Sequence, residues 1–138
     1  MEEAAWNGRC YVQRMVRLTV TLRPPARSVQ DLVDAFRFLM VSTRLEPGCV
    51  GCSAWTEPDA SVHYLEEWSS ERAIRRRVGS DRFTSVLALL ESVREPPHVQ
   101  FDFVSTTRGL DYIEEVRQHG AREAARHHRR EDSGDETQ

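Results

Sequence analysis

The stretch VHYLEEW (62–68), with SSERAIRRRVGSDRF (69–83) directly after it, decides the fold of this 138-residue chain. Residues 62–68 alternate between two faces as in a half-buried β-strand, and one face carries Val62, Tyr64, Glu66 and Trp68. The paired serines at its end can cap a short helix, and a glycine break then leads into a second amphipathic helix. A strand that runs straight into two helical segments fixes much of the topology.

One strand and one long helix are predicted upstream. Apolar and polar residues alternate cleanly over residues 15–22, which predicts a first strand that Pro24 ends. Ser28 stands where a helix N-cap belongs, and apolar residues at helical spacing continue to Met40. The helix is expected to end before EPG at residues 46–48, because the position before a proline disfavours helix and the glycine supplies a turn.

The remaining elements complete a regular order. A second strand is predicted over residues 50–56, and a turn joins it as a hairpin to residues 62–68. A further helix follows from Phe83 to Val93, and a last strand is predicted over residues 99–106. In the short helix after the hairpin, three residues are expected to face inward: Ala73, Ile74 and Val78.

This order predicts an α+β, ferredoxin-like split β-α-β fold with one four-stranded antiparallel sheet. The helices would cover one face of the sheet, so something else must cover the other. A second copy of the chain is the simplest candidate, because strands one and four carry apolar or aromatic bulk on both faces. The sequence therefore predicts a homodimer formed through the sheets.

Four segments are expected along the chain. Residues 1–13 form an N-terminal arm, residues 14–108 form the folded domain, and residues 109–126 form a C-terminal helical extension. From residue 127 to residue 138 the composition is charged and small, which predicts a disordered polar tail.

Composition excludes several classes of protein. The net charge is −3 and basic residues are interspersed with acidic ones, so no nucleic-acid partner is predicted. No apolar run approaches the roughly 18 to 20 residues of a membrane helix, and the start of the chain lacks the features of a signal peptide. We therefore expect a cytoplasmic protein without a membrane partner.

The three cysteines are too few, and odd in number, for a secreted disulfide scaffold. Cys49 and Cys52 form a Cys-x-x-Cys, but it lies at the entry to a strand rather than at the start of a helix, where a thiolate would be favoured. There is no second pair for a structural zinc site. The pair is interpreted as two small residues near a strand start, with a redox role as the alternative.

Four pieces of the sequence resemble the antibiotic biosynthesis monooxygenase domain family. They are RLEPGC at 44–49, YLEEW at 64–68, SERAI at 70–74, and Phe83 with the apolar run after it. The resemblance covers residues 15 to about 107. The resemblance implies a dimeric α+β barrel, and it leaves the activity open among quinol oxidation, anthrone-type oxygenation and haem degradation.

Two positions depart from the family pattern. Relatives that resemble quinol monooxygenases carry histidines where this chain has Arg77 and Arg82. A guanidinium stays protonated and cannot act as a base, whereas an imidazole can exchange a proton near neutral pH. Haem binding is also disfavoured, because arginine is not a haem ligand.

The candidate catalytic residues are Glu66, Arg77 and Arg82. Glu66 would act as a base or orient the substrate if its strand face looks toward the helices, and the alternative is a structural ion pair with one of the two arginines. Arg77 and Arg82 would stabilise an anionic substrate, or be solvated as part of an arginine-rich surface. Three aromatic side chains are predicted either to line a substrate pocket or to pack in the core: Tyr64, Trp68 and Phe83.

The leading functional hypothesis is a monooxygenase that acts on a quinol-like or polycyclic aromatic molecule without metal or other cofactor. In such chemistry the electron-rich substrate activates oxygen, so the protein needs only to deprotonate, position and shield it. The alternative is a non-catalytic dimer of the same fold that binds a small molecule or a partner protein. Haem binding is the third possibility.

Overall fold

The structure is a computed structural model that describes residues 14–134, and side chains up to residue 131. The arm predicted over residues 1–13 lies outside the described residues. The chain divides into two compact units, one ending at Ser105 and the other beginning at Thr106.

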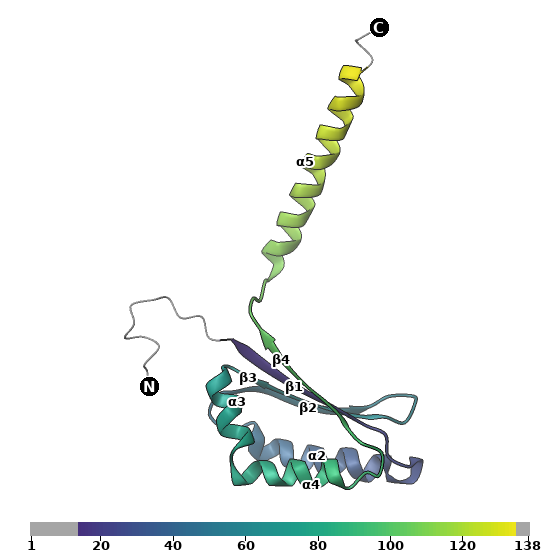
Figure 1. The fold of residues 1–138 in the computed structure, drawn as a ribbon, viewed down its shortest axis with the longest axis vertical. Helices are drawn as coiled ribbons and strands as arrows, with labels where there is room; N and C mark the ends of the chain where they lie inside the picture. Colours follow the sequence, from purple (N-terminus) through teal and green to yellow (C-terminus); the bar gives the residue numbers. More distant parts are fainter. Residues whose placement is uncertain (1–13, 135–138) are drawn as a thin grey trace, which may run out of the picture. The chain divides into compact units, whose positions relative to one another are not determined.

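The first unit is built on one four-stranded sheet (Figure 1). The strands are β1 (Met15–Leu22), β2 (Cys49–Thr56), β3 (Val62–Trp68) and β4 (His98–Val104), arranged in the order β2-β3-β1-β4. All three pairings are antiparallel. Strand β1 therefore lies between β3 and β4, which confirms the predicted ferredoxin-like split β-α-β fold.

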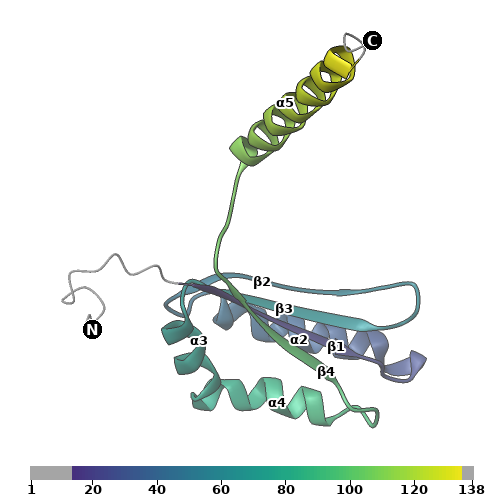
Figure 2. The same cartoon turned by 45° about the horizontal axis from the view of Figure 1, so that its top comes forward.

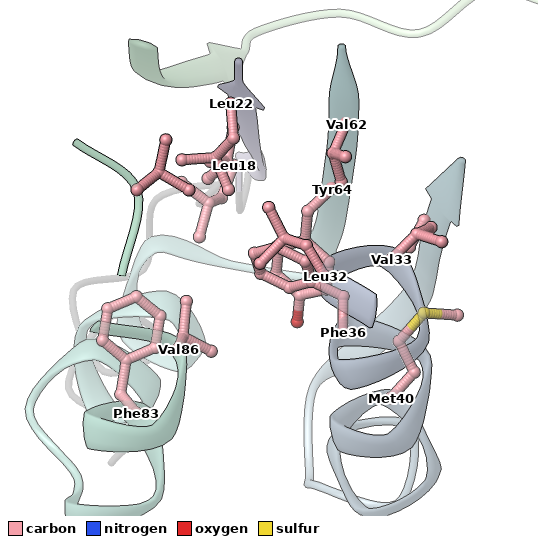
Figure 3. Close-up of a cluster of buried hydrophobic side chains, with 13 residues drawn as sticks. Leu18, Leu22, Leu32, Val33, Phe36, Met40, Val62, Tyr64, Phe83 and Val86 are labelled. Carbon is pink, nitrogen blue, oxygen red and sulfur yellow. The ribbon is translucent and has the colours of Figure 1, made fainter. Parts of the chain in front are cut away.

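The helices lie on one face of the sheet, as Figures 1 and 2 show. They are α2 (Val29–Thr43), α3 (Glu71–Val78) and α4 (Thr84–Glu91), with short 3-10 turns η1 (Ala26–Ser28) and η2 (Asp81–Phe83) before α2 and α4. The core fills the space between sheet and helices (Figure 3). Phe36 of α2 stacks on Tyr64 of β3 with ring centroids 4.6 Å apart, so the long helix is fixed to the middle of the sheet.

The two predicted serine caps behave differently. Ser70 has an extended backbone, and its hydroxyl accepts a hydrogen bond from the Ala73 amide at 3.1 Å, as an N-cap should. Ser28 precedes α2 as predicted, but its side chain makes no capping hydrogen bond. Its backbone is already helical because η1 runs directly into α2, and the geometry that a capping hydroxyl needs is absent.

On α3, one of the three residues predicted to face inward differs in the structure. Ala73 and Ile74 are buried as predicted, but Val78 is partly exposed and Arg77 is buried in its place. Arg77 lies between Ala73 and Ile74 around the helix, whereas Val78 lies at the edge of that face. Of the two alternatives for Arg77, solvation at an arginine-rich surface is therefore wrong.

The outer face of the sheet is largely polar. Glu67 of β3 accepts hydrogen bonds from Nε and Nη2 of Arg17 on β1, at 3.1 and 3.0 Å. Near the β2–β3 turn, the imidazole of His63 stacks on Trp55 with ring centroids 5.3 Å apart. Strand β1 places Thr19 and Thr21 on the same face as Arg17. The sheet thus presents carboxylate, imidazole and hydroxyl groups rather than a continuous apolar surface.

A hydrogen-bonded chain closes the β2–β3 hairpin. The buried Ser61 hydroxyl lies 2.5 Å from Oδ1 of Asp59 and 2.8 Å from Nε2 of His63. Ser61 donates to the carboxylate, so its oxygen accepts from Nε2–H of His63. The other ring nitrogen then accepts from the Thr21 hydroxyl at 3.3 Å. Hydrogen bonds from the Ser61 side chain and amide, together with Arg23, lower the pKa of Asp59 to about 2.

The second unit holds one helix, α5 (Leu110–Gly134). It was expected to end near residue 126, and the structure continues it through the first eight residues of the segment predicted to be disordered. Within this continuation, Nε2 of His127 lies 3.5 Å from Oε1 of Glu131, four residues further along the helix. Within the described residues, no helix is both long and apolar enough to cross a membrane.

Candidate functional site

The candidate site is a buried polar cluster on the helix-facing side of β3, here called the Glu66 cluster: Tyr64, Glu66, Trp68 and Arg77. Strand alternation places Tyr64, Glu66 and Trp68 on one face, as predicted. The Tyr64 hydroxyl donates to Oε2 of Glu66, and Nε1 of Trp68 donates to Oε1 at 2.9 Å. Two aromatic neighbours therefore hold the carboxylate from either side along the strand.

Arg77 of α3 binds the same carboxylate through two nitrogens. Its Nε lies 3.2 Å from Oε1 of Glu66 and its Nη2 lies 2.8 Å from Oε2, a bidentate arrangement. The two side chains are almost completely inaccessible to solvent. The pair joins α3 to the central part of the sheet.

Two further groups complete the environment of the Arg77 guanidinium. Nη1 donates to Oε2 of Glu46 at 2.7 Å, and Nη2 donates to the hydroxyl of Thr43 at 3.1 Å. Glu46 reaches Arg77 from the loop after α2, where Gly48 has φ +89° and an added Cβ would lie 2.6 Å from that of Ala73. Only glycine fits both the backbone conformation and the close packing at this position.

The surroundings of Tyr64 and Arg77 raise the pKa values of both side chains. Burial, followed by the charge of Glu66, raises the pKa of Tyr64 well above its usual range. Burial by itself would lower the pKa of Arg77, but the hydrogen bond and charge of Glu66, with those of Glu46, raise it above its usual value. Both groups therefore rest protonated at any physiological pH and donate hydrogen bonds to Glu66.

The cluster has one continuation toward β2. The Cys52 thiol donates to the Tyr64 oxygen at 3.5 Å, which gives a line of donors from Cys52 through Tyr64 to Glu66. A β-bulge between Cys49 and Gly51 sets Cys49 opposite Trp68 and Cys52 opposite Glu66, so both thiols lie on the helix-facing side.

Burial disfavours thiolate formation at both cysteines. It raises the pKa of Cys52 to about 11 and also raises that of Cys49. A thiol that stays protonated is a poor nucleophile and a poor metal ligand. The pair therefore lacks the electrostatic environment that a redox site needs.

The cluster satisfies its own hydrogen bonds. Among the described side chains, no buried nitrogen or oxygen atom lacks a partner. The described residues also contain no group of three histidine, cysteine or acidic side chains that could hold a metal ion. The position that would carry a haem ligand holds Arg77, whose guanidinium faces Glu66, so the residues present do not fit haem.

The structure brings together five of the six predicted site residues. Phe83 joins the Glu66 cluster, because the Arg77 guanidinium carbon lies 5.3 Å from the centre of its ring. Arg82 does not join it, since its side chain is exposed on η2. Sequence reasoning missed Thr43 and Glu46 as partners of Arg77. The only available signal was the charged residue beside the Pro47-Gly48 turn.

The structure also has an open groove of about 290 Å³ at the start of α2 and the end of α4. The residues that line it include Pro24, Asp31, Leu32 and Val93. None of its lining residues belongs to the Glu66 cluster.

Comparison with known proteins gives a family and a fold. The model of the family described as antibiotic biosynthesis monooxygenase matches residues 15–89, more than half of the chain. A search of curated proteins found no match.

Several solved structures share the fold. A conserved protein from Methanosarcina mazei Go1 has 20% identity and a TM-score of 0.60, over 68% of this chain and 96% of its own. A Caulobacter crescentus CB15 protein, provisionally named an antibiotic biosynthesis monooxygenase, has 20% identity and a TM-score of 0.59, over 70% and 94% of the two chains. The Mycobacterium tuberculosis protein Rv0793 has 17% identity and a TM-score of 0.59, over 70% and 98%.

Proposed function

The chain belongs to the antibiotic biosynthesis monooxygenase family, and from this premise we propose that it is a monooxygenase acting on an electron-rich aromatic molecule of the quinol or anthrone type. The single observation that supports the proposal is the Glu66 cluster, in which a carboxylate is oriented by three donors between aromatic walls. A carboxylate in such a place is suited to take a phenolic proton.

The reaction needs no electron donor besides the substrate. A quinol and O₂ give a hydroxyquinone and water, so one oxygen atom enters the ring and the other leaves as water. Both electron pairs that reduce O₂ come from the ring. The tasks left to the protein are to remove the hydroxyl proton, hold the ring and exclude water.

Glu66 would receive the proton through Tyr64. The Tyr64 oxygen at present accepts from the half-buried Cys52 thiol and donates to Glu66. A substrate hydroxyl that takes the place of the thiol would donate to Tyr64 while Tyr64 passes its own proton to the carboxylate. Trp68 and Phe83 would form the apolar walls.

The proposal makes Arg77 a positioning residue. Its three nitrogens already donate to Glu66, Glu46 and Thr43, so it holds the carboxylate in place and does not bind the substrate anion. Arg82 has no part in this scheme, because its side chain is exposed outside the cluster.

A second candidate function is a non-catalytic protein of the same fold that binds a small molecule or a partner. It is favoured by one observation, the closed state of the cluster. The Glu66 side chain is fully buried, and no buried polar atom among the described side chains lacks a partner. A substrate must therefore displace an existing hydrogen bond before any proton can move.

Oxygen uptake by purified protein with a panel of quinols and anthrones separates the two candidates. For a monooxygenase, consumption should exceed the uncatalysed rate and should fall on the order of a hundredfold or more in Glu66→Gln, the loss typical of a general base. Glu67→Gln is the matched control, since Glu67 lies on the opposite face of the same strand. No uptake with any substrate, or equal rates in the two variants, would leave the binding protein as the better description.

A further inference from the structure

The groove at the start of α2 and the end of α4 has a largely apolar lining. Its apolar members are Pro24, Pro25, Leu32, Ala35, Leu89 and Val93. Leu32 and Val93 are buried and belong to the hydrophobic core, and the two prolines have a fixed backbone angle. The lining therefore keeps its shape without a ligand, as most small-molecule sites do.

Three polar side chains complete the lining: Ser28, Asp31 and Ser92. Asp31 is the only charged residue among the described residues that line the groove. Within the part of the chain that the structure describes, its carboxylate has no ion pair and no hydrogen-bond partner. The groove thus contains a carboxylate that is available to a ligand.

Ser28 adds an unused hydroxyl at the same place. Its side chain does not cap α2, and it hydrogen-bonds to no other described residue. Ser28 and Asp31 are three residues apart where η1 runs into α2, a spacing that puts their side chains on the same side of the helix. Two polar groups without partners therefore lie together beside the apolar lining.

The sign of the charge in the groove follows from Asp31. The start of α2 and the end of α4 carry partial charges of about half a unit each, which are opposite in sign and offset one another. Arg23, just before the two prolines, already donates to Asp59 at 3.2 Å. Arg27 is exposed and is not among the described residues that line the groove. The carboxylate of Asp31 therefore leaves the groove negative, which favours a cationic ligand.

We propose that this groove binds a small amphiphilic amine, whose apolar ring packs on the prolines and whose ammonium group binds Asp31 and Ser28. An ammonium only donates hydrogen bonds, so it matches a carboxylate and the lone pairs of a hydroxyl. Since a cavity of about 150 Å³ holds benzene, the groove of about 290 Å³ has room for one substituted ring. The site shares no residue with the Glu66 cluster and does not depend on the proposed function.

An NMR titration of the full-length protein with 2-phenylethylamine tests the site. The amine should shift the amide signals of Leu32, Leu89 and Val93 in a saturable way. Two probes of similar size test the charge, since 2-phenylethanol is neutral and phenylacetate is anionic. Both should bind about tenfold more weakly or worse, the effect of losing a charge-assisted hydrogen bond. Equal affinity for the three probes, tighter binding of phenylacetate, or no saturable shift with the amine would overturn the proposal.

Substitutions of the polar residues identify the groups that bind the ammonium. Asp31→Asn should weaken binding of the amine about tenfold, and Ser28→Ala should weaken it about threefold. Asp34→Asn is the matched control, because Asp34 lies on the same helix but does not line the groove, and it already accepts a hydrogen bond from Gln30 at 2.9 Å. The control should change the affinity less than about twofold. Equal affinities of the Asp31 and Asp34 variants would contradict the proposal.

Ala35→Leu tests the location independently of charge. Ala35 lines the groove and is half-buried, so the larger side chain should fill part of the space. Leucine keeps helix propensity, and the circular dichroism spectrum should not change. Binding of the amine should weaken about tenfold or more, the effect of losing the apolar contact. Wild-type affinity in this variant would mean that the amine binds elsewhere. Any oxygen uptake should be the same in all four variants, which separates this site from the Glu66 cluster.

Discussion

Two consecutive glutamates on β3 each pair with an arginine, on opposite faces of the sheet. Glu66 faces the helices with a fully buried side chain, whereas the Glu67 side chain is 25% exposed and its partner Arg17 is 43% exposed. The ion-pair distances are similar, 2.8 Å for Arg77–Glu66 and 3.0 Å for Arg17–Glu67. Burial, rather than distance, therefore sets what removing one partner will cost.

The largest expected effect is that of Arg77→Leu. It leaves Glu66 buried without its counter-charge, so the free energy of unfolding should fall by about 3–5 kcal/mol. The measurement is urea denaturation followed by circular dichroism. Arg17→Leu is the matched variant on the outer face, and it should cost at most about 1 kcal/mol. Equal losses would remove the distinction between the two faces.

Glu66→Gln should have the next largest effect. The amide keeps the size of the side chain but weakens its charge-assisted hydrogen bonds, which should lower the free energy of unfolding by about 1.5–3 kcal/mol. The corresponding change Glu67→Gln should stay within about 0.5 kcal/mol. Should the stability of the two variants coincide, the Glu66 cluster does not stabilise the fold through its charge.

Alkaline pH should lower the stability of the fold through Cys52, on the helix-facing side of the sheet. The pKa of Cys52 is raised from 9.0 to about 11 in the folded state, so the unfolded chain loses its proton first as pH rises. The stability contributed by the protonated thiol is present below pH 9 and is lost up to about pH 11. Because Cys52 keeps some solvent contact, the loss should be smaller than the roughly 2.7 kcal/mol equivalent to two pKa units.

The pH dependence can be assigned with Cys52→Ala. This variant should show a shallower decline of stability between pH 9 and pH 11 than the wild-type chain, as measured by chemical denaturation at each pH. The raised pKa of Tyr64 should leave part of the decline in place. An unchanged slope would mean that Cys52 titrates as an exposed thiol.

Among the substitutions in the Glu66 cluster, Tyr64→Phe should have the smallest effect on stability. It removes one donor to Glu66 but keeps the ring stacked on Phe36, so the expected cost is about 0.5–1.5 kcal/mol. If Tyr64 relays a substrate proton, the same variant should lose a far larger factor in oxygen uptake. A proportionate loss of both properties would indicate a structural role alone.

Local pattern sufficed to predict β3 and the face that carries Glu66. The alternation over residues 62–68 matches the strand bounds and the burial of every second side chain. The local pattern could not predict which arginine pairs with Glu66. Arg77 and Arg82 lie on either side of the break after α3, and the direction of each side chain depends on how its segment packs. The contacts to Glu46 and Thr43 span 31 and 34 residues, a separation at which sequence spacing carries no information.

For the end of helix α5, by contrast, local composition gave the wrong prediction. Its charged composition over residues 127–134 predicted disorder, yet the structure has a helix there, in which His127 lies one turn from Glu131. For Ser28 the residue type predicted a cap, but the 3-10 turn that includes Ser28 gives it a helical backbone, in which its hydroxyl makes no capping hydrogen bond. In each case a neighbouring interaction outweighed the intrinsic preference of the residue.

The hydrogen-bonded chain in the β2–β3 hairpin contains the three residue types of a serine hydrolase triad. Their order is different, because the Ser61 hydroxyl lies between Asp59 and His63 and donates its hydrogen bond to the carboxylate. A triad instead places the imidazole between the acid and the serine, so that the hydroxyl can lose its proton to the ring. Ser61 therefore stabilises the hairpin and is not a nucleophile. A covalent serine-hydrolase probe should not label its hydroxyl.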